Sequence, residues 1–171
     1  MPATHTTQRA RTSRAKKSQS KDAIAFLKAD HREVEGWFAD FEKTGSDTRK
    51  QKLANQICMA LEIHTEIEEE IFYPAAREAG VEEDMMDEAD VEHNSAKKLI
   101  AEIKSGKAGD DHWDAKVHVL SEMIKHHVKE EEQRDGMFAK AKKADLDLET
   151  LGEQLSTRKK ALMKLKKNGR H

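Results

Sequence analysis

Four segments of the chain carry apolar residues at alternating spacings of three and four, the repeat that places side chains on one face of an α-helix. Each of these stripes is interrupted by a histidine. The stripes are Ile24, Leu27, His31, Val34, Phe38 and Phe41; Ile57, Leu61, His64, Glu68, Ile71 and Ala75; Met86, Ala89, His93, Ala96, Ile100 and Ile103; and Trp113, Val117, Leu120, Ile124, His127 and Glu131. Four such helices joined by short loops predict an all-α, up-down-up-down four-helix bundle.

Helix-ending signals separate the stripes. Thr44-Gly45-Ser46-Asp47 reads as a turn whose Ser46 or Asp47 caps the second helix. Pro74 is expected to kink or end that helix, and Gly80 to stop it. Gly136 interrupts the fourth pattern, which resumes at Met137-Phe138-Ala139.

The leucines beyond Asp145 are spaced as in a further helix, which we expect to pack outside the bundle. They are Leu148, Leu151, Leu155, Leu162 and Leu165. We therefore predict a four-helix bundle over 22–140 and a C-terminal helix with a basic end over 141–171. Residues 1–21 lack apolar periodicity and are predicted to form a disordered basic tail.

Composition excludes several classes of protein. The single cysteine, Cys58, rules out an internal disulfide. No apolar run is long enough to span a membrane, and the N-terminus lacks the apolar core of a secretory signal, so we expect a cytoplasmic protein. The net charge of −2 conceals an acidic body between two basic ends.

The histidines in the stripes are the candidate functional residues. A core position rarely carries an imidazole, because burying an unpaired polar group is costly. His64 and His127 are each followed four residues later by a glutamate, Glu68 and Glu131, on the same helix face. Imidazole suits iron, zinc and copper, and a carboxylate can bridge two ions. Four imidazoles, two carboxylates and no cysteine ligands favour a dinuclear non-haem iron centre.

The fourth helix offers two adjacent histidines, His126 and His127. The positions that precede His127 at helical spacings of three and four residues are all apolar. The corresponding positions before His126 include Lys116 and His112, which are polar. We therefore place His127 inward and His126 on the flank.

Simpler interpretations compete with a metal site. A single core histidine is commonly a hydrogen-bonded packing residue, and glutamate runs such as Glu68-Glu69-Glu70 are commonly solvated faces. The coincidence of one histidine in each of four stripes favours the metal site. A ferritin-like di-iron protein would need two Glu-x-x-His motifs, and the sequence has none; Asp90-Val91-Glu92-His93 comes nearest.

Four short segments carry a resemblance to a known family. They are Asp30-His31, the run from Ile63-His64 through Glu68 to Phe72-Tyr73-Pro74, Glu92-His93, and His126-His127 with the following Glu130-Glu131-Glu132. Over 22–140 the chain resembles hemerythrin-like proteins of the HHE cation-binding family. The resemblance implies two non-haem iron ions joined by an oxo or hydroxo bridge. It implies that His31 and His64 bind one iron, that His93 and His127 bind the other, and that Glu68 and Glu131 bridge them.

The chain departs from the oxygen-carrying members of that family. They have two histidines four residues apart on the third helix, whereas the positions four away from His93 are Ala89 and Lys97. Glu131 also replaces a bridging aspartate. Glu92 or another nearby carboxylate could fill the missing position. A more open site is better suited to oxygen or peroxide redox chemistry, nitric-oxide binding or iron handling than to reversible oxygen transport.

Two functions of different classes therefore follow from the sequence. The first is a di-iron protein that binds or responds to O2, peroxide or NO, with peroxide decomposition as an enzymatic variant. The alternative is a metal-independent helical interaction protein that uses its basic termini. We do not expect these termini to bind nucleic acid, because both lack the Phe, Tyr and Trp side chains on which bases stack.

Overall fold

The computed structural model describes residues 22–169, and every regular element in that range is helical. The elements are α1 (Ala23–Lys43), α2 (Asp47–Ile67), the π-helix η1 (Glu68–Phe72), α3 (Tyr73–Glu78), α4 (Glu83–Ser105), α5 (Trp113–Glu132), α6 (Met137–Lys143) and α7 (Leu148–Asn168). The predicted all-α bundle with an extra C-terminal helix is confirmed. The tail predicted over 1–21 lies outside the described residues.

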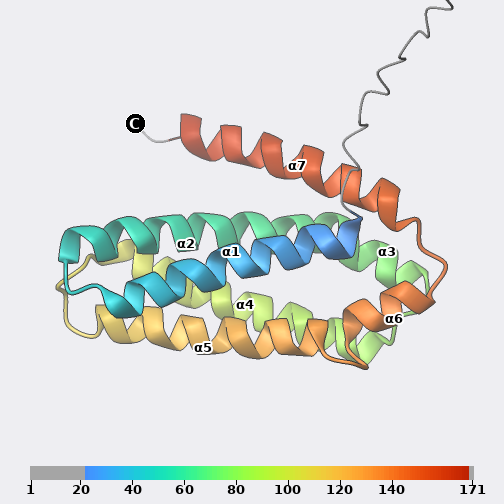
Figure 1. Cartoon of the computed structure of the whole chain (residues 1–171), viewed down its shortest axis with the longest axis horizontal. Coiled ribbons are helices and arrows are strands. Elements are labelled where there is room, and N and C mark those ends of the chain that lie inside the picture. Colours follow the sequence, from blue (N-terminus) through green and yellow to red (C-terminus); the bar gives the residue numbers. More distant parts are fainter. Residues whose placement is uncertain (1–21, 170–171) are drawn as a thin grey trace, which may run out of the picture.

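Helices α1, α2, α4 and α5 run side by side as the bundle, and α7 lies outside it along α1 and α2 (Figure 1). The starts of the helices follow the sequence signals. Ser46 caps α2, and its hydroxyl accepts a hydrogen bond from the Arg49 amide at 3.3 Å. Asp22 caps α1 in the same way, through the Ala25 amide at 2.8 Å.

The buried apolar side chains form two clusters separated by a polar layer. One cluster includes Ile24 and Leu27 of α1 together with Phe72 and Phe138. The other includes Phe38 of α1 and the tryptophan that begins α5. The four stripe histidines lie between the clusters: in α1, for example, His31 separates Leu27 of the first cluster from Val34 of the second. They therefore meet at one level of the bundle.

The second helix changes its pitch where the sequence predicted a kink or an end. Residues Glu68–Phe72 form a π-helical turn, and Pro74 follows in the first turn of α3, where its missing N–H is tolerated. The wider turn shifts the inward face by one residue. Ile71 and Ala75, which the stripe placed inward, are only partly buried, whereas Phe72, Tyr73 and Ala76 are fully buried.

Helix α5 ends at Glu132, and a short turn leads through Gly136 into α6. A Cβ atom on Gly136 would lie only 2.4 Å from the carbonyl oxygen of Glu130, so glycine is required by this close approach. Further on, α7 buries Leu151, Leu155 and Leu162, while Leu165 is exposed. None of the helices among the described residues is long and apolar enough to cross a membrane.

Candidate metal centre

Six side chains with metal-binding atoms converge in the layer between the two apolar clusters. They are His31 of α1, His64 of α2, Glu68 of η1, His93 of α4, and His127 and Glu131 of α5. All six are between 0% and 6% exposed. Their ligand atoms form two groups, one of His31, His64, Glu68 and Glu131 and the other of Glu68, His93 and His127. The structure thus brings together every candidate ligand named from the sequence, and Glu68 belongs to both groups.

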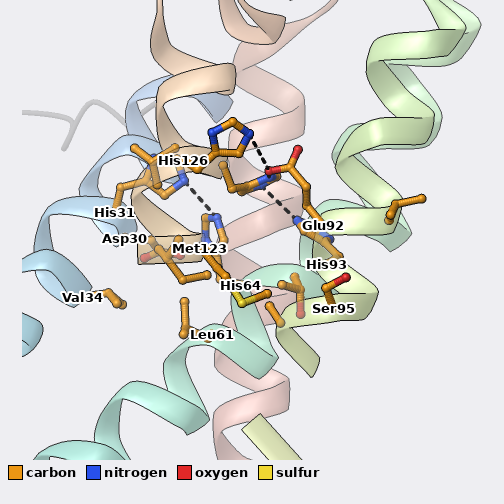
Figure 2. A pocket seen from close by; sticks show the side chains of 16 residues that line it. Asp30, His31, Val34, Leu61, His64, Glu92, His93, Ser95, Met123 and His126 are labelled. Atoms are coloured by element: carbon orange, nitrogen blue, oxygen red, sulfur yellow. Dashed lines mark hydrogen bonds and ion pairs between the residues drawn. The ribbon is translucent and has the colours of Figure 1, made fainter. Parts of the chain in front are cut away.

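The histidines face one another in two pairs through their Nε2 atoms. The Nε2 atoms of His31 and His64 are 3.1 Å apart, and those of His93 and His127 are 3.2 Å apart. Figure 2 shows the first pair, with the rings pointing toward each other from α1 and α2. Two neutral imidazoles whose Nε2 atoms are both acceptors repel at this distance, so a proton or a metal ion must lie between them.

Glu68 connects the two pairs through its separate oxygens. Its Oε1 lies 2.6 Å from His64 Nε2, and its Oε2 lies 3.1 Å from His93 Nε2. Glu131 also reaches both pairs, because its Oε1 lies 3.0 Å from His127 Nε2 and 3.4 Å from His31 Nε2. Two carboxylates placed between two imidazole pairs have the arrangement of bridging ligands.

Three of the four carboxylate oxygens of Glu68 and Glu131 lack hydrogen bonds. Both oxygens of Glu68 and Oε1 of Glu131 are buried without a hydrogen-bond partner among the described residues. A buried acceptor left in this state costs about 1–3 kcal/mol. A cation bound between the carboxylates and the Nε2 atoms would satisfy them, and the residues present therefore fit two metal ions.

Four outer carboxylates lie behind the imidazoles, and three of them accept a hydrogen bond from an Nδ1 atom. The Nδ1 atom of His64 donates to Asp30 at 3.0 Å, that of His93 to Glu69 at 3.0 Å, and that of His31 to Glu132 at 2.9 Å. Nδ1 of His127 lies 3.5 Å from Glu92. A carboxylate accepts the Nδ1 proton, so it orients the ring and leaves Nε2 free for a metal.

These outer carboxylates link neighbouring helices in a ring. Asp30 of α1 holds the histidine of α2, and Glu69 of η1 holds that of α4. Glu92 of α4 faces the histidine of α5, and Glu132 of α5 holds that of α1. Each outer carboxylate is the sequence neighbour of one of the six candidate ligands. Sequence reasoning missed this role for Asp30, Glu69 and Glu132, although the adjacency was visible.

Basic side chains stand behind the outer carboxylates. Lys97 Nζ contacts both oxygens of Glu69, at 2.7 and 2.6 Å, and Arg32 pairs with Glu132. Lys159 donates to Asp30 at 2.5 Å. Lys97, four residues after His93, thus holds the outer carboxylate of Glu69. Ala89, four residues before His93, is buried and has no metal-binding atom.

The electrostatics of the layer are those of closely spaced ion pairs. Burial by itself would lower the pKa of His64, but the negative charge of Glu68, together with the hydrogen bond to Asp30, raises it to about 10. Burial would raise the pKa of Glu68, and the neighbouring imidazoles instead hold it well below its usual value. His64 thus holds a proton in the metal-free protein, at a position where a metal ion would otherwise bind.

Tyr73 is a site residue that the stripe pattern did not predict. Its hydroxyl lies 3.1 Å from His93 Nε2 and 3.4 Å from both His127 Nε2 and Glu131 Oε2. Burial, reinforced by the charges of Glu131 and Glu68, raises the pKa of Tyr73 well above its usual value, so the phenol keeps its proton. The π-helical turn brings it inward, and the aromatic-proline pair Tyr73-Pro74 was the signal in the sequence.

The adjacent histidines of α5 take different positions. His127 is buried in the layer, whereas the His126 side chain is 65% exposed and lies on the flank, with its Nε2 4.0 Å from Glu92. Glu92 itself lies behind His127 Nδ1 and not among the Nε2 atoms. It therefore occupies an outer position in this arrangement.

A pocket of about 220 Å³ adjoins the histidines (Figure 2). Its walls are largely apolar and include Val34, Leu61 and Met123. All four histidines line it, but Glu68, Glu131 and Tyr73 do not. The pocket therefore reaches the imidazoles without being lined by Glu68, Glu131 or Tyr73. Val91, which is 65% exposed, lines it as well and marks the way to the surface.

Comparisons with known proteins agree with this architecture. A family model described as the hemerythrin HHE cation binding domain matches residues 22–140. A crystal structure of an HHE cation binding domain-containing protein from Mycobacterium kansasii superposes with a TM-score of 0.68 and 22% identity, covering 83% of this chain and 87% of that one. A DNA nickase from Nostoc sp. is 30% identical over 106 residues, which are 62% of this chain. The alignment spans only 30% of the nickase.

Proposed function

The chain belongs to the hemerythrin HHE cation-binding domain family, and we propose that it is a cytoplasmic protein whose buried layer holds two non-haem iron ions. In this proposal His31 and His64 bind one ion, His93 and His127 bind the other, and Glu68 and Glu131 bridge them. The bound ions would react with O2, peroxide or NO.

One observation carries the proposal: the two oxygens of Glu68 face different histidine pairs, 2.6 Å from His64 and 3.1 Å from His93. An apolar side chain would pack better in this position than a fully buried carboxylate without a hydrogen bond. Packing alone therefore does not explain why the residue is a glutamate. Bridging two cations supplies the missing partners.

The iron ions, when bound, would supply redox-active positions open to small ligands. The chain's own residues shape what reaches them. The largely apolar lining of the pocket suits small, weakly polar molecules such as O2 and NO. The Tyr73 hydroxyl holds a proton 3.1 Å from His93 Nε2, where it can donate to a ligand on that side.

The donor set favours reactivity over reversible transport. Each half has two imidazoles, and the residues four away from His93 supply no third. Fewer protein ligands leave more positions for exchangeable molecules on both ions. Peroxide decomposition is the enzymatic form of this proposal, and iron handling is a second use of the same open site.

The experiment that tests this function exposes the reduced, iron-loaded protein to O2, hydrogen peroxide and NO while its absorption spectrum is recorded. We expect rapid spectral changes with each ligand and peroxide turnover above that of free iron. Tyr73→Phe should retain its iron but lose most of the turnover, because the phenol proton is gone. A long-lived oxygen adduct that releases O2 unchanged would contradict the proposal.

The alternative, an interaction protein that does not depend on metal, draws on the basic ends. Within the described part of the C-terminal end, Arg158 pairs with Glu70, Lys159 with Asp30 and Lys166 with Glu62. These cations are therefore engaged by the bundle and less available to phosphates. Partner or DNA binding that survives chelation and disappears on deletion of 1–20 and 158–171 would favour this alternative over the di-iron proposal.

A further inference from the structure

We infer that Lys159, on the helix outside the bundle, is a positioning residue for the His31–His64 half of the metal site and acts through Asp30. The inference rests on the proposed function, because it concerns how tightly that half holds a metal ion. Lys159 lies in α7, beyond the 22–140 that match the family model. The site would thus depend on a residue that the family domain does not contain.

Asp30 is held at both of its carboxylate oxygens. Its Oδ2 accepts a hydrogen bond from His64 Nδ1 at 3.0 Å, and its Oδ1 accepts one from Lys159 Nζ at 2.5 Å. The Asp30 side chain is 12% exposed and that of Lys159 28%, so solvent screens this contact only in part. Lys159 Nζ also lies 5.5 Å from the centroid of the Phe26 ring, a second contact that fixes its position.

Fixing both oxygens fixes the plane of the carboxylate, and the carboxylate in turn fixes the ring of His64. The direction of the Nε2 lone pair depends on that ring orientation. Outer partners of metal-binding histidines tune affinity in this way. Without Lys159, Asp30 would keep its bond to His64 but could rotate about its side-chain torsions, and the imidazole would lose a fixed support.

The same pattern of imidazole, carboxylate and cation occurs elsewhere in the site. Lys97 of α4 holds Glu69 behind His93, and Arg32 of α1 holds Glu132 behind His31. These two cations belong to helices of the bundle itself. Lys159 completes the equivalent arrangement from outside the bundle, which identifies its contact with Asp30 as part of the site rather than a general surface ion pair.

Other contacts keep α7 in place when Lys159 is changed. Leu151, Leu155 and Leu162 are buried beneath the helix. Lys166 pairs with Glu62 at 3.1 Å, and among the described residues the Glu62 carboxylate pairs with Lys166 and Lys104 rather than with any of the six candidate ligands. The Lys166 side chain is 31% exposed, close to the 28% of Lys159. Lys166 is thus a matched control that docks the same helix away from the site.

The test measures metal affinity in the full chain, with Co²⁺ alone as the probe. Metal-free wild type, Lys159→Met, Lys159→Arg and Lys166→Met are titrated against a competing chelator, and the Co²⁺ absorption bands report each binding step. Substituting an outer carboxylate partner costs about 10- to 100-fold in affinity. Lys159 acts one contact further out, so we expect about a tenfold loss.

The predicted result is a loss confined to one of two binding steps in Lys159→Met, no loss in Lys166→Met, and affinity nearer to wild type in Lys159→Arg. Thermal midpoints of the metal-free Met variants should be alike, because each loses one ion pair of α7. Equal affinities in wild type and Lys159→Met, or equal losses in both Met variants, would overturn the inference. Failure of the wild type to bind Co²⁺ would instead count against the proposed function.

Discussion

Glu68 is the residue on which both halves of the candidate site depend. It is fully buried, it contacts both histidine pairs, and the two glutamates that follow it in the chain have different tasks. Glu69 holds His93, and Glu70 pairs with Arg158 on the surface. Three consecutive glutamates therefore serve as a ligand, an outer support and a surface ion pair. Their roles follow from the direction in which each side chain leaves the helix.

We predict that Glu68→Gln lowers bound iron from two ions per chain to one or none. The amide keeps the size of the side chain but removes the negative charge that would bridge two cations. Glu70→Gln, two residues away on the same π-helical segment, is the control and should retain both ions. Elemental analysis of the two variants, purified in parallel, measures the iron content per chain in each. Full iron content in Glu68→Gln would show that this carboxylate is not a bridging ligand.

The raised pKa of His64 predicts the pH dependence of metal binding. Its value in the folded, metal-free protein is about 10, because Glu68 and Asp30 outweigh the opposing effect of burial. A metal ion must displace this proton, so binding should release protons and strengthen as pH rises toward about 10. A pH indicator during Zn²⁺ titration measures the release. Affinity that is independent of pH would contradict the assignment of His64 as a ligand.

The same shift affects the stability of the metal-free protein with the opposite trend. A group whose pKa is higher in the folded state than in the unfolded state stabilises the fold. This contribution is complete at pH values below the unfolded-state pKa, which is near 6.5 for histidine. That contribution is lost as pH rises toward about 10. The thermal midpoint of the chelated protein should therefore fall over this interval in wild type and change less in His64→Ala. Equal slopes would show that the imidazole is not charged in the fold.

Among the elements, the π-helix explains where prediction from sequence succeeded and failed. The alternation of three and four identified all six candidate ligands, because an α-helix keeps that repeat up to Glu68. Beyond it, the same repeat placed Ile71 and Ala75 inward, whereas the π-turn turns Tyr73 inward instead. A local change of pitch stabilised by packing leaves no periodic signal. Glutamate runs likewise look solvated, so the supporting role of Glu69 and Glu132 became visible only with the fold.

The turn after α5 is the element whose geometry is most sensitive to substitution. A Cβ on Gly136 would lie 2.4 Å from the carbonyl oxygen of Glu130 and 2.9 Å from that of Glu131. We predict that Gly136→Ala destabilises the fold by about 1–3 kcal/mol, the usual cost of overpacking, and lowers iron content by displacing Glu131. Gly45→Ala meets nothing within 4 Å and is the control. Denaturant unfolding of both variants measures the difference in stability. Equal unfolding midpoints would contradict the close approach of the Glu130 carbonyl oxygen to Gly136.

At the scale of the whole molecule, metal binding should contribute to stability. The polar layer separates two apolar clusters, and without a metal ion it holds buried carboxylates that lack hydrogen bonds. At a thousandfold excess of metal over its Kd, binding adds about 4 kcal/mol, which is roughly 10 °C in the thermal midpoint for a chain of this size. Calorimetry before and after chelation measures this shift. A midpoint unchanged by chelation would argue for a structural layer without metal.

The most direct test of the account is the number of iron ions per chain after native purification. It is measured in wild type, in His64→Ala, and in His118→Ala, which removes an exposed histidine that pairs with Glu42 on the surface. We predict two ions in wild type and His118→Ala, and one or none in His64→Ala. Wild-type protein without metal, or His64→Ala with the full two ions, would contradict it.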